Sequence, residues 1–297
     1  SDTCILIKFW AFFPWRSSLS ELINYENINN INVLIVRLKH FIDSKIIDNL
    51  TSLKYILTAT TGTVHLDKTV INSNNIKVYS LKNEKNFLKE ITSTPELTWG
   101  LIISLFRNIH QSYNDVINGN WNRDRFFGNQ LSNKTIGLIG LGRVGSQVAE
   151  YAQAFKMNVS YYDPYVNSKK YKKLNNLVDL FKTSDIISVH VHVDQSTTKM
   201  INIDLLRRCK SSTVLINTSR GEIWNENDIV QCLEQNIISG IATDVISEET
   251  KLLHSSPIWK KRKDLNILIT PHIGGASYDA LEQCELKVQS NLINDLK

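Results

Sequence analysis

The chain has 297 residues and a formal net charge of +5 at pH 7, from 34 lysines and arginines against 29 aspartates and glutamates. A hydrophobic fraction of 42% and an aromatic fraction of 9% exclude a disordered chain and are enough for one large or two ordinary domains. The small charge does not indicate a nucleic acid, and no stretch approaches the ~20 apolar residues of a membrane-spanning helix. We therefore expect a globular protein with no nucleic-acid partner and no membrane partner.

Two basic clusters, at 169–173 and 260–263, are hydrophilic and are interpreted as solvated faces, with a patch for a polyanion as the alternative. The opening segment 1–18 lacks a basic start and carries charges inside, so it is not predicted to be a signal sequence. The cysteines lie far apart, without metal-binding or redox spacing, which favours reduced thiols in a cytoplasm. They are Cys4, Cys209, Cys232 and Cys284.

Short runs rich in Ile, Leu and Val alternate along the chain with stretches of helical pattern. The runs are nearly continuous in apolar residues, which is typical of parallel strands buried on both faces. The order of the runs therefore predicts an α/β architecture with parallel sheets. The runs lie at 33–38, 53–60, 76–81, 135–141, 158–163, 186–191, 213–218, 239–245 and 266–271.

The longest helical pattern runs from Pro95 to about Asn118, with Ser93 or Thr94 before it as a start signal. Three of the strand-like runs precede this helix and the others follow it. We therefore place a domain boundary near residue 93, and a second crossing near 271–275, where Pro and Gly interrupt the chain. The expected parts are a domain of 1–92, a domain of 93–272 and a C-terminal segment of 273–297.

Three glycines give the most specific signal in the sequence. Gly140, Gly142 and Gly145 close a strand-like run and open an amphipathic helix, and the next strand ends in Asp163, 18 positions after Gly145. This is the dinucleotide-binding fingerprint in its required setting: the first glycine allows the tight turn, the second lets a pyrophosphate approach, and the third lets helix and sheet pack closely. The diphosphate would bind at the helix N-terminus. The alternative is a glycine-rich turn that binds no ligand.

Asp163 also predicts which dinucleotide binds. A carboxylate at the end of this strand accepts hydrogen bonds from the ribose hydroxyls and repels a 2′-phosphate. Pro164 and Tyr165, which follow it, supply no Arg for that phosphate. The sequence therefore favours NAD over NADP.

Three polar residues lie at or after the ends of later strands: Arg220, Glu249 and His272. Because ligands bind beyond the carboxyl ends of the strands in open α/β sheets, all three could meet at one site. A His suits proton transfer near neutral pH, a neighbouring carboxylate raises its pKa, and a guanidinium can bind a substrate carboxylate with two hydrogen bonds. Taken one by one, residues of these types are more often ordinary surface or core residues.

Six segments of the sequence, which match the pattern of a known family, identify these three residues as candidates for a functional site. They are 95–98, the stretch around Trp121, 137–145 with Asp163 and Pro164, 217–221, 242–245 and 271–275. On these segments the chain, from about Arg37 to Cys284, resembles the NAD-dependent D-2-hydroxyacid dehydrogenases, and within them it is most similar to the D-3-phosphoglycerate dehydrogenases. The resemblance implies a Rossmann domain inserted into a smaller, flavodoxin-like α/β substrate domain, with the active site in the cleft between them.

The resemblance implies the catalytic roles. Arg220 anchors the substrate, His272 is the acid/base, and Glu249 is the carboxylate paired with the His. Glu249 is chosen over its neighbour Glu248 because the family's Glu lies five positions after the Asp that corresponds to Asp244. The resemblance also implies further NAD contacts, at Thr61, Arg143, Val144, Asp163, Val191, Thr218, Asp244, His272 and Gly274.

In the first third of the chain, the resemblance implies residues that bind the substrate. Backbone amides around Thr61 and Gly62 would bind the substrate carboxylate, and Arg37 matches an Arg that faces a substrate phosphate in phosphoglycerate dehydrogenases. Thr58 lies where those enzymes often carry a second Arg, which weakens the case for a phosphorylated substrate. His190 and His192 alternate along one strand as metal ligands might, but no third ligand is suitably spaced, so no metal is expected.

The sequence therefore predicts an oxidoreductase that transfers a hydride between NAD(H) and a D-2-hydroxy acid or 2-oxo acid, which could be 3-phosphoglycerate. The helix from Pro95 and the stretch around Trp121 resemble the family's dimerisation arm, so we expect a homodimer. A reductase of glyoxylate, hydroxypyruvate or another 2-oxo acid is the alternative within this class. The alternative from another class is a corepressor-like protein that binds NAD(H) as a sensor.

Overall fold

The computed structural model describes residues 28–37, 41–63, 65–249 and 253–297. Segment 1–18 and Cys4 lie outside the described residues. The chain divides into two compact units: 1–91 together with 278–297, and 92–277. In the part of the chain that the structure describes, no helix is both long and apolar enough to cross a membrane.

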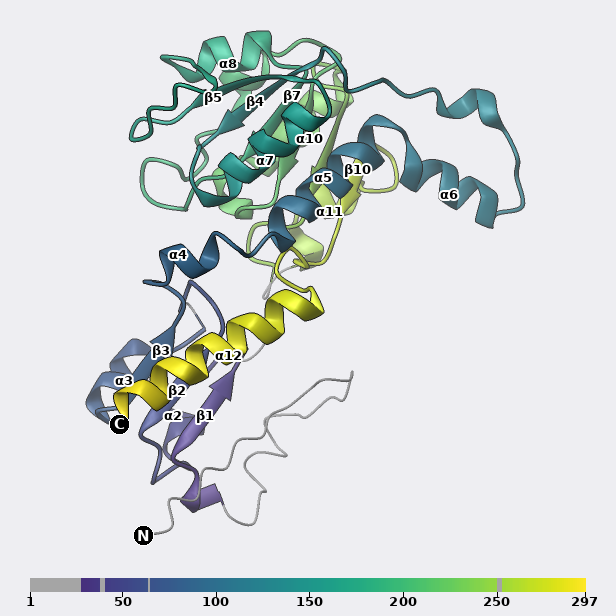
Figure 1. Ribbon diagram of the computed structural model, residues 1–297. Helices are drawn as coiled ribbons and strands as arrows, with labels where there is room; N and C mark the ends of the chain where they lie inside the picture. The colour runs from purple at the N-terminus through teal and green to yellow at the C-terminus, as the bar shows by residue number, and fades with distance from the viewer. Residues whose placement is uncertain (1–27, 38–40, 64, 250–252) are drawn as a thin grey trace. The chain divides into compact units, whose positions relative to one another are not determined.

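The first unit is a three-stranded parallel sheet, in the order β1-β2-β3, with helices on both faces (Figure 1). On one face, residues of β1 and β2 pack with Ile46, Ile47 and Ile71 of α2 and α3. On the other face, Cys284, Val288 and Leu292 of the long C-terminal helix α12 pack against all three strands. The elements are η1 (Ile28–Asn30), β1 (Val33–Val36), α2 (Ser44–Ile47), β2 (Tyr55–Thr58), α3 (Lys68–Ser73), β3 (Lys77–Ser80), α4 (Lys85–Leu88) and α12 (Tyr278–Asp295).

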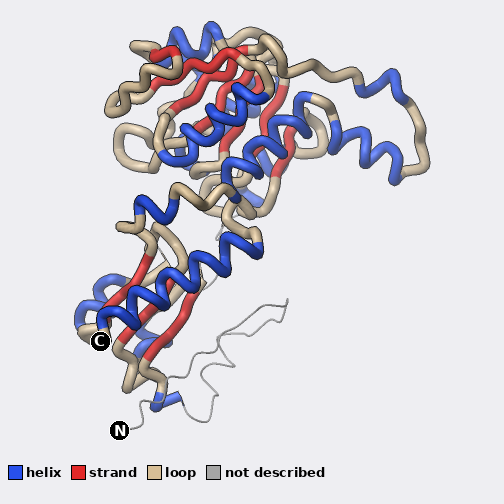
Figure 2. Tube along the Cα trace, viewed as in Figure 1, coloured by secondary structure: helices blue, strands red, loops and turns tan. Residues whose placement is uncertain are grey.

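The second unit contains a seven-stranded sheet in the order β10-β9-β8-β7-β4-β5-β6, and every neighbouring pair is parallel. Figure 2 shows the strands in red and the helices in blue. The strand order reverses between β4 and β7, so this is a doubly wound Rossmann sheet, and the α/β prediction is confirmed. The strands are β4 (Thr135–Ile139), β5 (Asn158–Tyr162), β6 (Lys172–Lys173), β7 (Ile186–Val189), β8 (Val214–Asn217), β9 (Gly240–Thr243) and β10 (Ile267–Ile269). Each of the nine predicted runs contains a strand; the prediction missed β6, which consists of two lysines.

Helices cover both faces of this sheet and bury its apolar side chains. One core lies between the sheet and α5 and α7. The other lies between the sheet and α8, α9, α10 and α11. The helical elements are α5 (Ser93–Phe106), α6 (Ile109–Ile117), η2 (Arg123–Phe126), α7 (Arg143–Ala154), α8 (Leu177–Thr183), α9 (Ile203–Leu206), η3 (Gly221–Ile223), α10 (Glu226–Glu234), η4 (Leu253–Ser255) and α11 (Pro257–Lys261).

The prediction of one helix from Pro95 to Asn118 is wrong, because the helix is interrupted between α5 and α6. Asn108 has a left-handed φ of 53°. Gly128 packs against the end of α5, where a Cβ on Gly128 would lie 2.4 Å from the carbonyl oxygen of Phe106. The N–H of Asn129 donates to the same oxygen at 2.9 Å. A segment some twenty residues further along thus takes the terminal carbonyl of α5.

The predicted start of this helix is also corrected. The capping position is Thr92 rather than Ser93 or Thr94. The hydroxyls of Ser93 and Thr94 instead donate to the carbonyl oxygen of Gly274, at 2.8 and 3.1 Å. The two residues therefore join the first turn of α5 to the segment that follows β10.

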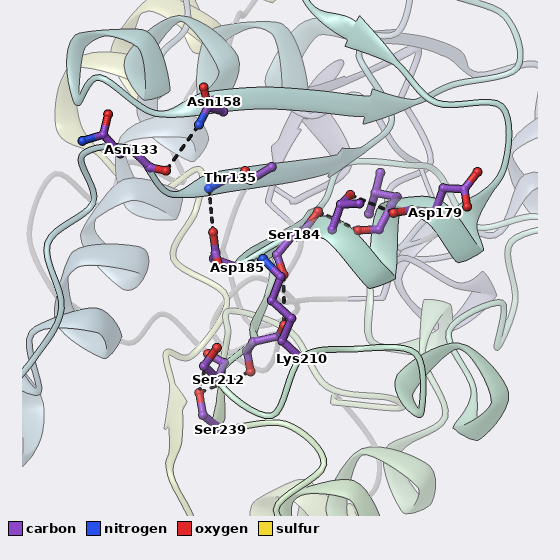
Figure 3. Close-up of polar contacts among 12 residues, drawn as sticks. Asn133, Thr135, Asn158, Asp179, Ser184, Asp185, Lys210, Ser212 and Ser239 are labelled. Carbon is purple, nitrogen blue, oxygen red and sulfur yellow. Dashed lines mark hydrogen bonds and ion pairs between the residues drawn. The ribbon is translucent and has the colours of Figure 1, made fainter.

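Polar contacts at the amino ends of the strands connect segments of neighbouring strands in the sheet (Figure 3). The carboxylate of Asp185, just before β7, accepts the N–H of Thr135 on β4 at 2.8 Å and the ammonium of Lys210 at 2.9 Å. Near β9, the hydroxyl of Ser239 donates to the carbonyl oxygen of Ser212 at 3.0 Å. The polar groups at this amino edge form hydrogen bonds with one another. The three catalytic candidates lie at the opposite, carboxyl edge of the sheet.

Candidate active site

The three glycines after β4 differ in what surrounds them. Gly140 has a φ of 92°, and a Cβ there would lie 2.5 Å from the carbonyl oxygen of His190. A Cβ on Gly145 would lie 2.2 Å from the carbonyl oxygen of Gly140, whereas nothing lies within 4 Å of a Cβ on Gly142. Packing therefore requires glycine at 140 and 145. At 142, glycine leaves open space in front of the first turn of α7.

Asp163, at the end of β5, holds this glycine turn. Its carboxylate is buried, and Oδ2 accepts the N–H of Leu141 at 2.9 Å. Oδ1 accepts the N–H groups of Tyr165 and Val166 at 2.8 and 3.0 Å. Of the roughly four acceptor positions of a carboxylate, three are thus used within the protein. The sequence predicted only the contact with a ribose and missed this internal role.

Arg220 lies in a turn that follows β8 and is fixed by Asn217. The amide of Asn217 donates to the carbonyl oxygen of Arg220 at 2.9 Å, and its oxygen accepts the N–H of Ser219 at 3.0 Å. The Ser219 hydroxyl ties the turn to β7 through the carbonyl oxygen of Val189, at 2.7 Å. The backbone of Arg220 is therefore held while its guanidinium is exposed.

His272 and Glu249 form a hydrogen-bonded pair between Nδ1 of the ring and Oε1 of the carboxylate. This hydrogen bond raises the pKa of His272; burial and the charge of Arg220 oppose the rise, and Asp244 adds to it. The partner is Glu249, while its neighbour Glu248 occupies a left-handed backbone position, with φ 53°. Because Glu249 occupies Nδ1, Nε2 is the ring atom left to exchange a proton with a substrate.

His272 itself has a left-handed φ of 53°, which is rare outside glycine and costs free energy. Asp244, at the end of β9, holds this conformation. Its buried carboxylate accepts the N–H groups of Ile273 and Gly274 at 2.8 and 2.7 Å and the hydroxyl of Thr270 at 2.6 Å. The sequence predicted Asp244 as a cofactor contact and gave no sign of this internal function.

The other predicted NAD contacts of this unit lie at the same carboxyl edge of the sheet. Val191 follows β7 and packs beside Gly140, Thr218 follows β8, and Gly274 follows β10. Thr218 shares a hydrogen bond with Thr98 of α5 at 2.9 Å. Arg143 and Val144 are the first residues of α7.

His190 and His192 do not alternate along a strand, because β7 ends at Val189, before both of them. His190 is half-buried beside the glycine turn; its Nε2 shares a hydrogen bond with Ser188 at 2.9 Å, and burial of the ring lowers its pKa to about 3. His192 is exposed. Among the described residues, no group of three His, Cys, Asp or Glu side chains could hold a metal ion.

The remaining predicted substrate contacts lie at the carboxyl edge of the three-stranded sheet. Thr61 and Gly62 belong to the turn after β2, where the hydroxyl of Thr60 donates to the carbonyl oxygen of Gly62 at 2.6 Å. Thr58 is fully buried, and its hydroxyl shares a hydrogen bond with Nε2 of His65 at 3.1 Å. Arg37, just after β1, is paired with Glu285 of α12: Nη2 and Nε lie 2.5 and 3.0 Å from the same carboxylate oxygen.

In the second unit, one sheet edge thus presents an imidazole with its carboxylate, an exposed guanidinium, and a glycine turn with open space before a helix N-terminus. The imidazole can move a proton, the guanidinium can bind a carboxylate, and the turn can receive a diphosphate. Together these groups suit redox chemistry at an alcohol or ketone beside a carboxylate, with a dinucleotide as the electron carrier.

Comparisons with known proteins agree with this chemistry. The sequence model of the family described as "D-isomer specific 2-hydroxyacid dehydrogenase, NAD binding domain" matches residues 99–274. The chain is 29% identical over 277 residues to the D-3-phosphoglycerate dehydrogenase of Bacillus subtilis, which covers 92% of this chain and 51% of that protein. It therefore spans about half the length of that relative.

Two further likenesses cover most of both proteins. The glyoxylate reductase of Thermofilum pendens is 30% identical over 295 residues, covering 95% of this chain and 83% of that enzyme. Among solved structures, the D-lactate dehydrogenase of Aquifex aeolicus, complexed with NAD and lactic acid, gives a TM-score of 0.70 at 27% identity, covering 91% of this chain and 85% of that one.

Proposed function

The chain belongs to the D-isomer specific 2-hydroxyacid dehydrogenase family, and we propose that it is an NAD-dependent enzyme that interconverts a small D-2-hydroxy acid and its 2-oxo acid. The observation that carries this proposal is the pair of His272 and Glu249 on the same sheet edge as the glycine turn of the NAD-binding domain. When bound, NAD(H) would supply the acceptor or donor of the hydride that leaves or reaches C2 of the substrate.

The residues after β4 and β5 fit this cofactor. The space in front of Gly142 would admit the diphosphate, and the first turn of α7 would bind it through backbone N–H groups. Asp163 keeps about one acceptor position for a ribose hydroxyl, and its negative charge disfavours a 2′-phosphate. These features support NAD as the preferred dinucleotide.

His272 would act as the acid/base through Nε2. In oxidation it takes the proton of the C2 hydroxyl, and in reduction it gives a proton to the oxygen of the 2-oxo group. Glu249 fixes the ring through Nδ1 and stabilises its charged form. Arg220 would bind the substrate carboxylate, which orients C2 towards the cofactor.

We further propose that the substrate carries no phosphate. Arg37 is the matching cation for a phosphate, and its guanidinium is already paired with Glu285, whose side chain is only 12% exposed. Thr58, in the place of a second cation, is neutral and buried against His65. A phosphate arriving there would compete with a carboxylate for one guanidinium. A short acid without a phosphate fits better, such as the 2-oxo acid named in the glyoxylate reductase relative or the 2-hydroxy acid named in the D-lactate dehydrogenase relative.

We also propose that the protein forms a homodimer in a reducing compartment such as the cytoplasm. Helix α6 extends away from the sheet of its unit and has no buried residue (Figure 1). Its exposed face is apolar, with Ile109, Tyr113, Val116 and Ile117, which supports an interface with a second copy. Cys209 and Cys232 are free thiols, as expected where disulfides are reduced.

A panel of 2-oxo acids tests the proposed function, with NADH oxidation as the measurement. Turnover of at least one short unphosphorylated acid is expected, at a higher kcat/KM than 3-phosphohydroxypyruvate. An NAD(H)-sensing protein would bind NADH, which a fluorescence titration detects, but would transfer no hydride to any acid. That result would reject the proposal of an enzyme and support an NAD(H)-sensing protein.

A further inference from the structure

Glu226, the first residue of α10, is a buried carboxylate outside the candidate catalytic set. Its Oε1 accepts the backbone N–H of Ser247 at 2.8 Å, and its Oε2 accepts the hydroxyl of Ser256 at 2.5 Å. A buried charge is tolerated only where hydrogen bonds replace its lost hydration. Here both replacements come from outside α10, from residues that lie on either side of Glu249 in the chain.

The same backbone is fixed from a second direction by Gly221. A Cβ on Gly221 would lie 2.1 Å from the carbonyl carbon of Ile246 and 2.2 Å from the backbone nitrogen of Ser247. Backbone therefore packs on backbone at this point. Because Gly221 directly follows Arg220, the turn that carries Arg220 is in contact with the segment that carries Glu249.

Ser247 is thus held between Gly221 and Glu226, two residues before the carboxylate that binds His272. We propose that Glu226 is a positioning residue: by binding Ser247 and Ser256 it places Glu249 so that its carboxylate reaches Nδ1 of His272. The placement rests on the geometry alone, and its consequence for hydride transfer rests on the function proposed above.

The role depends on the hydrogen bonds of Glu226 rather than on its charge. Glu226→Gln keeps an oxygen for the N–H of Ser247 and presents an amide that can donate to the Ser256 hydroxyl, so the placement survives. Glu226→Ala removes both bonds. Ser256→Ala removes one of them, together with the cap that Ser256 gives to the N–H of Trp259 in α11.

A matched control lies at the other end of the same helix. Glu234 is a glutamate of α10 that is paired with Lys261 of α11 at 2.7 Å, in an exposed position. Glu234→Gln therefore breaks a contact between the same two elements without touching Ser247 or Ser256. Surface pairs of this kind contribute little to stability.

The test is a titration of the His272 imidazole by NMR, in the unaltered protein and in each variant, with the signal assigned by its loss in His272→Asn. The charged groups that act on this ring are Glu249, Arg220 and Asp244, and the proposal requires a displacement of Glu249. We expect the pKa of His272 to fall in Glu226→Ala, towards its value in Glu249→Gln. A smaller fall is expected in Ser256→Ala, and no change in Glu226→Gln or Glu234→Gln.

Two results would overturn the proposal. If folded Glu226→Ala and Ser256→Ala leave the His272 titration unchanged, Glu226 only stabilises the fold. If Glu226→Gln lowers the pKa as far as Glu226→Ala does, the charge of Glu226 acts on the ring and its bonds do not position Glu249. Where Glu226→Ala fails to fold, the comparison of Ser256→Ala with Glu226→Gln decides in the same way.

Turnover adds a second readout that separates this proposal from the proposed function. Misplacing the catalytic carboxylate should lower kcat of Glu226→Ala roughly 10- to 100-fold with little change in KM for NADH. A His272 titration that responds as expected in a protein that turns over no 2-oxo acid would support the positioning role and reject the dehydrogenase.

Discussion

At the scale of single residues, His272 depends on two carboxylates with different tasks. Glu249 binds the ring and raises its pKa, whereas Asp244 binds the backbone that gives His272 its left-handed φ. The first task concerns proton transfer and the second concerns placement. Substitutions at the two positions should therefore have different signatures.

The pH dependence tests the first task. Oxidation of the hydroxy acid needs His272 without its proton, so kcat/KM in that direction falls as pH drops through the pKa of His272. Removing the negative charge lowers that pKa. Glu249→Gln should therefore move the acidic limb to lower pH, and Glu248→Gln, the adjacent control, should leave it in place. An unchanged limb in Glu249→Gln, or a shifted one in Glu248→Gln, would reject the assignment of the pair.

The ion pair of Arg37 with Glu285 gives a prediction about substrate choice. Glu285→Gln frees the guanidinium for an anion, and a hydrogen bond to a charged group is worth ~1.5–3 kcal/mol, or roughly 10–150-fold. The variant should gain kcat/KM for a phosphorylated 2-oxo acid by a factor in that range and change little with glyoxylate. Asp295→Asn, which breaks the pair of the same helix with Lys77, is the matched control. Equal kinetics of Glu285→Gln and wild type on both acids would show that Arg37 does not face the substrate.

At the scale of elements, two glycines of the turn after β4 have different functions: Gly145 is required for packing, and Gly142 leaves space for a ligand. Gly142 has ordinary backbone angles and open space, so Gly142→Ala should keep the melting temperature while weakening NADH binding. Gly145→Ala must push its Cβ against the carbonyl of Gly140, and overpacking of this kind costs about 1–3 kcal/mol of the free energy of unfolding. Thermal melting and NADH titration of the two variants check this. A destabilised Gly142→Ala with normal NADH affinity would contradict the assignment of the open space to the diphosphate.

The elements also show what the sequence could and could not predict. The strands, the glycine turn and its dinucleotide follow from local patterns of apolar residues and glycine, so they could be predicted. The break at Asn108 could not, because it is set by Gly128 and Asn129, some twenty residues further along. The internal bonds of Asp163 and Asp244, to residues 22 and 30 positions away, likewise exist only after folding.

At the scale of the whole molecule, the apolar face of α6 predicts the oligomeric state. Ile117 is 62% exposed and Tyr113 is 64% exposed, which a free monomer seldom tolerates on one helix face. A charge at the centre of such an interface would be desolvated without a partner. Ile117→Glu should therefore shift a dimer to a monomer in light scattering after gel filtration, while Asn114→Glu, on a polar position of the same helix, should not. A monomeric wild type would reject the dimer.

The measurement that tests the central claim most directly is NADH oxidation by the wild type and by His272→Ala, over a panel of short 2-oxo acids, with NADH affinity measured in parallel. We expect the wild type to reduce at least one acid. His272→Ala should retain NADH binding and lose kcat by ~10²–10⁴-fold, as for a lost general acid/base. Equal turnover in the two proteins, or NADH binding by the wild type with no turnover of any acid, would contradict it.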